Sequence, residues 1–245
     1  MPVAERHGIV EKLYLRPRVE MAPGHSLTCI AGYGINGEQH ANRLSPRQVL
    51  ITLASELEAL SIAPGALFEN IVISLPTALQ FKPGSALVFE SGVEIRLTMF
   101  CEPCKVIGAV ARDLKKMLRR RGILGLFVHG GELRRGETFT LIPARYRPLP
   151  DSMQQRFADF LATVPPGRVV RYLDVTVAMG VDASFIRALP GYIRRASALS
   201  LPLHRIVNAR GELLAFVPGQ AGLLVAEGVT VNGNCVDLTQ YCWQG

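Results

Sequence analysis

Short apolar runs, several of them alternating with polar positions, fill the first half of the chain. Alternation of this kind is typical of strands with one buried face. The runs occupy residues 8–15, 26–30, 69–73, 86–89, 93–99, 124–129 and 138–142. Turns that contain glycine or proline separate them, so we expect a compact, mostly-β barrel. Helical spacing appears at residues 48–60 and 106–118.

Helical spacing is the main pattern of the second half. Residues 153–163 are predicted to form an amphipathic helix with its aromatic side chains on the apolar side. A short helix over 173–179 follows, and Asp182 can cap the next helix over 183–195. Two helices joined by a turn, with arginines on the second, are a candidate for nucleic-acid binding.

Three prolines without a periodic pattern mark the boundary between the halves, within residues 143–151. Such a composition is typical of a semi-rigid linker. We therefore expect a first domain over residues 1–143, a Pro-rich linker over 144–151 and a second domain over 152–245.

Composition narrows the class of protein. The chain has 245 residues, of which 49% are hydrophobic, and this suffices for two cores. Its five cysteines are odd in number and unevenly spaced, unlike a secreted disulfide framework. No signal peptide and no run as long as a membrane span is evident. We therefore expect a cytoplasmic protein with reduced thiols and no membrane partner.

The net charge of +7 is unevenly divided. Residues 1–150 carry 19 basic and 13 acidic residues, whereas residues 151–245 carry eight arginines, no lysine and seven acidic residues. The basic excess of the first half could hold an anionic cofactor or a phosphate. A solvated helix face is the alternative interpretation of the basic run at 115–121.

Covalent chemistry is concentrated at Cys101-Glu102-Pro103-Cys104, between the predicted strand at 93–99 and the predicted helix at 106–118. A helix N-terminus and the neighbouring Lys105 would both favour a thiolate at Cys104. Equally, the two cysteines could be small buried apolar residues. Zinc is disfavoured because no second CxxC or His pair completes a site, and a thioredoxin-like pair lacks its βαβ pattern.

Six short motifs follow one another along residues 37–137. They are Gly37-Glu38-Gln39-His40, Arg47-Gln48-Val49, Glu69-Asn70, Pro103-Cys104, Arg120-Arg121-Gly122-Ile123-Leu124 and Gly131-Glu132-Leu133-Arg134-Arg135-Gly136-Glu137. In this order and spacing they resemble the MOSC domain, named for the C-terminal part of molybdenum-cofactor sulfurases, over roughly residues 5–145. The resemblance implies a β-barrel with one essential cysteine, here Cys104.

Members of that family are thought to carry sulfur on this cysteine or to bind a molybdenum-pterin cofactor with it, and some reduce N-hydroxylated compounds. A thiolate suits molybdenum as a ligand, and a persulfide carrier needs an accessible nucleophilic thiolate. The resemblance thus implies a molybdenum-cofactor-dependent oxidoreductase or a sulfurtransferase, with a small-molecule or sulfur-donor partner. The residues expected around the cofactor are Glu38, His40, Arg47, Asn70 and Arg121.

The chain departs from this family in two places. Glu38 stands where Asp is usual, and Phe68 stands where Gly is usual. Glu38 and His40 could shuttle a proton or contact the cofactor, or could simply make structural loop contacts. Arg47 and Arg121 could bind phosphate or pterin oxygens in a bidentate manner, or could form salt bridges.

Five further motifs run along residues 164–229. They are Val164-Pro165-Pro166-Gly167-Arg168-Val169-Val170-Arg171-Tyr172, Ile186-Arg187-Ala188-Leu189, Pro202-Leu203-His204-Arg205-Ile206-Val207, Gly211-Glu212-Leu213 and Leu223-Leu224-Val225-Ala226-Glu227-Gly228-Val229. Together they resemble the C-terminal domain of the alkylguanine-DNA alkyltransferases over about 152–243, and imply an α-rich winged helix-turn-helix fold. The family's acceptor cysteine lies in Pro-Cys-His-Arg, and Leu203 stands in its place. The second half is therefore similar to alkyltransferase-like proteins, which lack the acceptor.

Leu203 offers no lone pair for a displacement, so we expect no active alkyltransferase. His204 and Glu227 match the residues that activate the thiol, and we expect them to form a buried hydrogen-bonded pair beside Leu203 in the lesion pocket. A protein that binds a lesion without reacting is physically sensible, because flipping is cheapest for damaged bases.

The partner implied for the second half is duplex DNA. Arg187 matches the arginine that enters the duplex where a base is flipped, and Tyr172 matches the residue that turns the backbone phosphate. Arg168 is a further candidate phosphate contact. Several departures from the family pattern weaken the inference that this half binds DNA. Phe185 and Ile186 are bulkier than usual, Pro190 replaces a glycine, and Ala196 replaces an asparagine.

Two functions of different classes are thus expected. The first is molybdenum-cofactor binding or sulfur transfer at Cys104 of the barrel. The alternative is recognition of DNA lesions by the second domain, with the barrel as an accessory.

Overall fold

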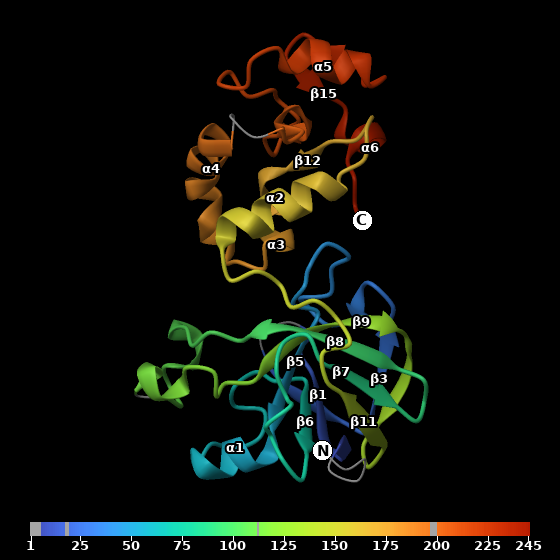
Figure 1. The fold of residues 1–245 in the computed structure, drawn as a ribbon, viewed down its shortest axis with the longest axis vertical. Helices are drawn as coiled ribbons and strands as arrows, with labels where there is room; N and C mark the ends of the chain where they lie inside the picture. Colours follow the sequence, from blue (N-terminus) through green and yellow to red (C-terminus); the bar gives the residue numbers. More distant parts are fainter. Residues whose placement is uncertain (1–5, 18–19, 112, 197–199) are drawn as a thin grey trace. The chain divides into compact units, whose positions relative to one another are not determined.

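The computed structural model describes residues 6–17, 20–111, 113–196 and 200–245. The chain divides into two compact units, which we call unit 1, up to Leu149, and unit 2, from Pro150 (Figure 1). A mostly-β unit followed by a helical unit is the predicted fold class, which is confirmed. Among the described residues, every helix is too short or too polar to span a bilayer.

Seven strands of unit 1 close into a barrel. They are β1 (His7–Leu15), β5 (Val49–Leu53), β6 (Ile71–Ser74), β7 (Ala86–Phe89), β8 (Glu94–Phe100), β9 (Ile123–His129) and β11 (Thr138–Ile142). The ring order is β11-β7-β8-β9-β5-β6-β1, and β1 pairs with β11 to close it. An odd ring cannot be wholly antiparallel, and the parallel pair is β5–β6.

Smaller sheets flank this barrel. The short strand β2 (Ala22–Gly24) extends it beside β1. A three-stranded sheet joins β3 (Ser26–Ile30), β4 (Gly34–Ile35) and β10 (Gly131–Arg134). The barrel core contains branched aliphatic and aromatic side chains from nearly every strand, among them Val10, Leu13, Ile51, Ile73, Leu87, Ile95, Phe127 and Phe139.

The helix predicted over 48–60 is wrong in its first half. Val49–Leu53 is the strand β5, and only Ala54–Ala59 forms a helix, α1. All five residues of β5 are buried because the strand lies between β6 and β9 and is covered on both faces. A continuous apolar run of this kind has no strand period, so periodicity could not distinguish it from a buried helix.

The helix predicted over 106–118 is also wrong. The described residues there form two 3₁₀ turns, η2 (Lys105–Ile107) and η3 (Leu114–Met117). Asp113 starts the second turn by accepting a hydrogen bond from the backbone N–H of Lys115. This local alternative competes with a continuous helix. Arg112 lies outside the described residues.

The start of the predicted linker packs on the barrel. The guanidinium of Arg145 contacts the buried carboxylate of Glu94, with Nε 2.7 Å from Oε1, and the hydroxyl of Tyr146 donates to the same oxygen. Arg96 donates to the carbonyl oxygen of Arg147 at 2.7 Å. Residues 145–147 are therefore part of unit 1 rather than a free tether.

Unit 2 is a helical domain with small strands. Its helices are α2 (Met153–Thr163), α3 (Tyr172–Ala178), α4 (Leu189–Arg195), α5 (Gln220–Ala226) and α6 (Leu238–Tyr241), with the 3₁₀ turns η4 (Ala183–Ala188) and η6 (Leu203–Arg205). Two strand pairs complete it: β12 (Val170–Arg171) with β13 (Ile206–Val207), and β14 (Val231–Asn232) with β15 (Cys235–Val236). Phe157, Leu161, Val175, Leu189 and Ile193 are fully or almost fully buried in its core.

The helix-turn-helix prediction holds with one correction. α3 is followed by a turn in which Asp182 caps the next element by accepting from the backbone N–H of Ser184. The predicted helix over 183–195 is divided into η4 and α4, and Pro190 lies in the first turn of α4. The N–H groups in the first turn of a helix have no acceptor within that helix. Proline, which lacks an N–H, therefore costs no hydrogen bond there and favours the start of a new helix.

Candidate functional site

The thiol of Cys104 lies beside a buried arginine. Nη1 of Arg121 donates to Sγ of Cys104 at 3.2 Å and to the carbonyl oxygen of Glu102 at 2.9 Å. Nη2 contacts the carbonyl oxygen of Leu67 at 3.3 Å. Arg121 is 6% exposed, whereas Cys104 is exposed to solvent. A buried guanidinium thus lies within hydrogen-bond distance of an accessible sulfur.

Two local features fix this arginine. A Cβ at Gly122, whose φ is 121°, would lie 2.4 Å from the carbonyl oxygen of Ile51, so the chain needs glycine directly after Arg121. The buried carboxylate of Glu69 accepts from the backbone N–H groups of Gly65 and Leu67. This orders the loop whose carbonyl oxygen contacts Arg121.

The helix expected after Cys104 does not supply its electrostatics. Only the three-residue turn η2 follows, and such a turn has no appreciable dipole to offer. Arg121, from the far end of the segment, provides the positive charge instead. A thiolate at Cys104 stays a prediction, and the cation observed beside its sulfur is Arg121 rather than a helix N-terminus.

Cys101 differs from Cys104 in every respect that matters for reactivity. It is 2% exposed and packs with Leu50 and Leu124. Burial raises the pKa of the Cys101 thiol, and the positive charges of Arg121 and Arg47 offset this only in part. A buried thiol that resists ionisation is a packing residue, so the geometry separates the two cysteines.

Glu38 and Asn70 form a buried pair that ties the glycine-rich loop to the barrel. Oε2 of Glu38 accepts from Nδ2 of Asn70 at 3.0 Å and from the backbone N–H of Arg16 at 2.8 Å. Oδ1 of Asn70 accepts from the backbone N–H of Leu50 at 3.0 Å. Burial raises the pKa of Glu38 although these donors act against it. Both side chains are thus engaged in anchoring strands and a loop.

His40 lies at the exposed end of the same loop. Partial burial of the imidazole and the positive charges of Arg16 and Arg47 lower its pKa. The charge of Arg47 acts on His40 and also on the thiol of Cys101. Sequence reasoning missed Arg16, which belongs to none of the motifs.

Phe68 explains one departure from the MOSC pattern. Its φ is 63°, in the left-handed region that glycine adopts without strain, and glycine is the usual residue there. The ring compensates by packing against the cluster around Leu57, and the guanidinium of Arg16 lies 4.5 Å from its centroid. Phe68 therefore holds Arg16 near the loop of His40.

These groups suit an anionic ligand that also uses one sulfur donor. Arg16, Arg47 and Arg121 are cationic, and Nε of Arg121 is buried without a hydrogen-bond partner among the described residues. Cys104 is the accessible sulfur. Within the described part of the chain, no three His, Cys, Asp or Glu side chains gather to hold a metal ion by themselves.

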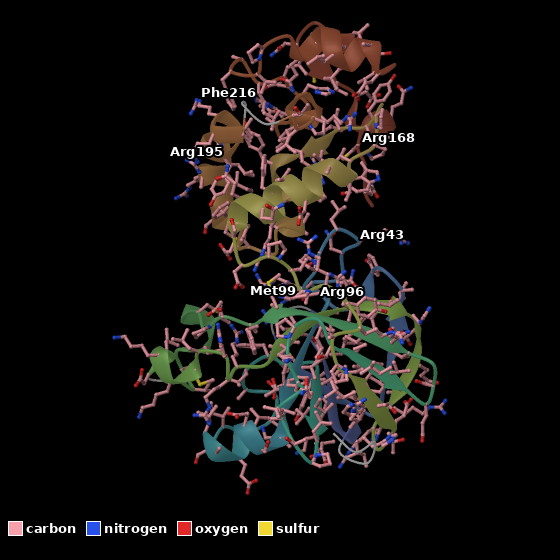
Figure 2. All side chains as sticks on the ribbon, viewed as in Figure 1. Arg43, Arg96, Met99, Arg168, Arg195 and Phe216 are labelled. Atoms are coloured by element: carbon pink, nitrogen blue, oxygen red, sulfur yellow. The ribbon has the colours of Figure 1, made fainter. Side chains whose placement is uncertain are left out.

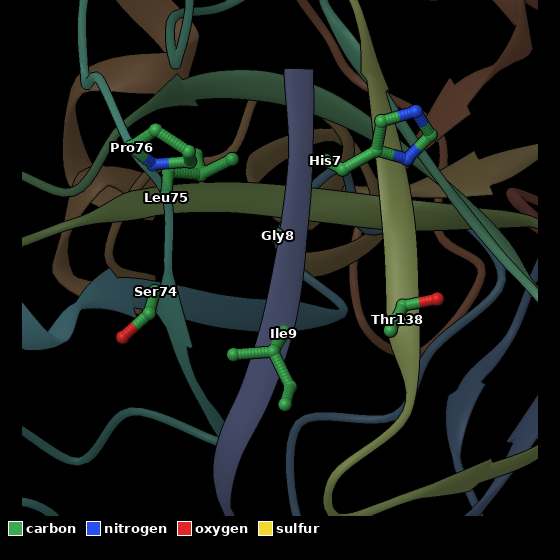
Figure 3. Close-up of a pocket in the computed structure, with 7 residues that line it drawn as sticks. All are labelled: His7, Gly8, Ile9, Ser74, Leu75, Pro76 and Thr138. Atoms are coloured by element: carbon green, nitrogen blue, oxygen red, sulfur yellow. The ribbon is translucent and has the colours of Figure 1, made fainter. Parts of the chain in front are cut away.

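A sizeable pocket of unit 1 lies away from these residues. It has a volume of about 570 Å³ and is lined by His7, Gly8, Ile9, Ser74, Leu75, Pro76 and Thr138 (Figure 3). Its walls come from β1, from β6 with the residues that follow it, and from the start of β11. None of the predicted site residues lines it, so this pocket is not the site that the motifs predict.

In unit 2, Leu203 occupies the position that a nucleophile would need. It is 8% exposed and opens the turn η6. The next residue, His204, has Nε2 2.8 Å from Oε1 of Glu227, so the predicted pair is formed. Arg205 binds the same carboxylate through Nη2 at 2.6 Å and donates to the carbonyl oxygen of Val164.

This carboxylate is held in its charged form. Burial opposes ionisation of Glu227, but Arg205, His204 and the backbone N–H of Gly167 outweigh it and lower the pKa of Glu227 to about 2. Gln220 steadies the same turn by donating to the carbonyl oxygens of His204 and Ile206. The network is saturated and structural, with no thiol to activate.

Two of the predicted DNA-contacting residues lie on helical elements, and Arg168 lies in the loop before β12. Arg187 is exposed on η4, and Tyr172 begins α3, where its ring is half-buried against the core. Arg168 is exposed, although its Nη1 donates to the carbonyl oxygen of Gln240 at 2.7 Å. The structure therefore leaves Arg187 available and ties Arg168 to the C-terminal segment.

Two further arginines of α4 lie over aromatic rings. The guanidinium of Arg194 is 4.6 Å from the ring centroid of Phe216, and that of Arg195 is 4.7 Å from the centroid of Tyr192. Figure 2 labels Arg195 and Phe216 in unit 2. Stacking holds these long side chains in place at low entropic cost. The sequence places both arginines on the predicted helix but indicates no partner for either.

Known proteins resemble the chain in both units. The YiiM protein of Escherichia coli is 15% identical, with a TM-score of 0.42 over 78% of this chain and 94% of YiiM. The S. pombe protein Atl1, in complex with damaged DNA containing O6-carboxymethylguanine, is 21% identical, with a TM-score of 0.36 over 40% of this chain and 99% of Atl1. Both likenesses are remote, and the MOSC resemblance of unit 1 stays a prediction.

Sequence similarity is firmer in unit 2. The family model of the 6-O-methylguanine DNA methyltransferase DNA binding domain matches residues 152–229. The DNA base-flipping protein of Escherichia coli is 36% identical over 98 residues, which cover 38% of this chain and 75% of that protein. Unit 2 is thus an alkyltransferase-like DNA-binding domain, and through it the chain belongs to the family of the DNA base-flipping protein.

Proposed function

We propose that unit 2 binds duplex DNA and recognises an alkylated base turned out of the stack, without removing the alkyl group. The observation that carries this proposal is Leu203, an apolar side chain at the acceptor position beside a network that commits His204 to Glu227. A leucine cannot displace an alkyl group, whereas the surrounding turn retains its hydrogen bonds.

Base flipping has a physical cost that a lesion reduces. Extruding a nucleotide costs a few kcal/mol and least when the base is damaged, so a binder without chemistry can still discriminate. Arg187 is exposed at the end of η4 and can fill the vacated position in the stack. The relatives named as DNA base-flipping proteins support this assignment.

The test is fluorescence anisotropy of the full chain with duplexes that contain O6-methylguanine or unmodified guanine. Non-specific dissociation constants should fall near 10⁻⁴–10⁻⁶ M at physiological salt, with tighter binding to the lesion. Arg187→Ala should remove most of the lesion preference. Arg168→Ala should weaken both duplexes alike, because a phosphate contact carries no sequence information.

Arg210→Ala is the matched control, since Arg210 is exposed and pairs with Glu212 on another part of unit 2. It removes the same charge and should leave the preference unchanged. The proposal would be contradicted if the full chain binds both duplexes equally. It would also be contradicted if Arg187→Ala leaves the preference for the lesion duplex unchanged.

A second function is favoured for unit 1 by the contact between Cys104 and Arg121. We infer that Cys104 carries sulfur or holds a molybdenum-pterin cofactor, with Arg16, Arg47 and Arg121 neutralising its anionic groups. Such a cofactor would supply redox chemistry at its metal. This chain's own residues would orient it: Cys104 would be the sulfur ligand, and Arg121, which donates a hydrogen bond to that sulfur, would hold it in place.

Mass spectrometry after incubation with a sulfur donor, together with molybdenum analysis of the purified protein, tests this second function. Cys104→Ser should abolish sulfur loading or metal retention, and Cys101→Ser should have a smaller effect because that thiol is buried. Equal losses in the two variants would indicate a redox pair instead. If the wild-type protein shows no sulfur loading and contains no molybdenum, both forms of the inference are rejected.

A further inference from the structure

The positive charge of unit 1 is concentrated in one segment. Residues 105–121 contain seven basic residues and one acidic residue. The rest of unit 1 contains twelve basic and twelve acidic residues, so the whole excess of +6 lies in this segment. A surface with such a concentrated charge attracts polyanions far more strongly than a dispersed charge of the same size.

The segment is anchored on one side and exposed on the other. Ile107, Ala111 and Met117 are buried in a cluster with residues of α1 and β6. Figure 1 shows the segment, in green, extending beyond the strands of the barrel. The buried residues fix the position of the described part of the segment around them, which includes residues 113–121.

Three cations form this outer surface, which we call the basic lobe: Lys115, Lys116 and Arg119. All three are exposed. The last two arginines of the segment do not contribute, because one pairs with Glu56 at 2.7 Å and the other is buried against the thiol of Cys104. Among the residues that the structure describes, the side chains of Lys115 and Lys116 form no ion pair.

Unit 2 lacks the charge that DNA binding normally uses. It carries eight arginines against seven acidic residues. Three of those arginines are already paired within the unit: Arg171 with Asp174, Arg205 with Glu227 and Arg210 with Glu212. Non-specific affinity for a duplex comes chiefly from phosphates neutralised by lysine and arginine. The required charge is present in the chain, but in unit 1.

We propose that the basic lobe binds the phosphate backbone of duplex DNA and supplies the ionic part of the chain's affinity. The choice of DNA rests on the function proposed for unit 2, and the phosphate contact rests on the charge and exposure of the lobe. An anionic membrane is the weaker partner. The turns η2 and η3 span three and four residues, too short to lay an amphipathic helical face into a bilayer.

The experiment measures the binding of the full chain to an undamaged duplex between about 50 and 200 mM salt. The variant is Lys115→Gln, Lys116→Gln and Arg119→Gln together. Its affinity at the lowest salt should fall roughly tenfold or more, and the slope of log K against log salt should flatten by about one for each phosphate that the lobe no longer neutralises. Circular dichroism confirms that the variant is folded.

The matched control is Lys12→Gln, Lys82→Gln and Arg135→Gln, which removes the same charge from exposed positions elsewhere on unit 1. It should keep the wild-type slope. An unchanged slope in the lobe variant, or equal losses in lobe and control variants, overturns the proposal. If the lobe variant loses binding to phosphatidylserine vesicles while its salt slope for DNA binding stays unchanged, the proposal is overturned in favour of a lipid surface.

The same titrations, repeated with an O6-methylguanine duplex, separate this proposal from the function of unit 2. A lobe variant with a flattened slope and an intact lesion preference supports both. A flattened slope in a chain that has no lesion preference supports the lobe and rejects the proposed lesion recognition. An intact preference with an unchanged slope rejects the lobe alone.

Discussion

The Nε2 atom of His204 lies 2.8 Å from Oε1 of Glu227, and Nη2 of Arg205 donates to the same oxygen at 2.6 Å. All three residues are at most 16% exposed in their side chains. Because the charged carboxylate has a permanent cationic partner in Arg205, the pair is stable without a thiol beside it. The hydrogen bonds of this carboxylate hold the turn that carries Leu203.

The stability of unit 2 should therefore depend on the charge of Glu227. Its pKa of about 2 in the folded protein is below the ordinary value of 4.5, so its contribution is complete above pH 4.5 and is lost as the pH falls toward 2. Glu227→Gln should cost about 1–3 kcal/mol at neutral pH. Calorimetry should show a gap between the wild-type and variant Tm that narrows below about pH 4.5.

Asp159→Asn, an exposed carboxylate of α2, is the control and should give no such gap. A gap for Glu227→Gln that stayed constant down to pH 2 would mean that the carboxylate acts through its shape rather than its charge.

The chain should transfer no alkyl group to itself. The acceptor position holds Leu203, and the remaining thiols of unit 2 are poorly placed: burial and the carboxylate of Asp174 raise the pKa of Cys242, while Cys235 donates to the carbonyl oxygen of Arg210. DNA with a labelled methyl on O6 of guanine should leave the protein unlabelled after denaturation. Stoichiometric label on any cysteine would refute this.

The sequence predicted the barrel because its short apolar runs end at glycine and proline turns. Residues 86–89, 138–142 and 153–163 were predicted with the bounds that the structure shows. The failure at 48–53 has a physical cause, since β5 is buried on both faces and its neighbours are distant in sequence. A strand that is buried on both faces shows no alternation of apolar and polar residues, so its sequence pattern does not identify it as a strand.

The site was predicted as a set of residues but not as an arrangement. Cys104 and Arg121 were both named, yet their contact depends on a loop that Glu69 orders and on a close approach at Gly122. Arg16 was missed because a single arginine after a strand carries no signal. Its role became visible only where the side chain lies over Phe68.

Glu94 should control how firmly the segment after β11 is held. Its buried carboxylate contacts Arg145 and Tyr146. Glu94→Ala leaves both without that partner, so local opening should become easier. We expect trypsin to cleave after Arg145 several-fold faster than in the wild type, by a rough estimate, as measured by mass spectrometry of timed digests.

Glu90→Ala is the control for this digest, because Glu90 is exposed and its carboxylate accepts from the hydroxyl of Thr138, away from the segment that is cleaved. It should leave the cleavage rate unchanged. Cleavage that is equally fast in the wild type would show that the segment opens regardless of Glu94.

Asn70→Asp distinguishes a structural from a cofactor role for Asn70. The new carboxylate keeps the shape and still accepts from the backbone N–H of Leu50, but it replaces the amide that donates to Glu38 at 3.0 Å. Two buried carboxylates this close cannot both ionise without cost. Burial already raises the pKa of Glu38, so the variant should be destabilised at neutral pH and should recover as acid protonates the pair.

Thermal unfolding of the full chain across pH measures this, with Asn70→Ala as the comparison. Asn70→Ala leaves the N–H of Leu50 without its acceptor and should lose about 1–3 kcal/mol at every pH. Recovery confined to Asn70→Asp at low pH would establish that Asn70 and Glu38 brace the barrel. If Asn70→Asp instead unfolds like the wild type and loses only sulfur or molybdenum loading, the buried pair is dispensable and Asn70 acts on the cofactor, as the MOSC resemblance implies.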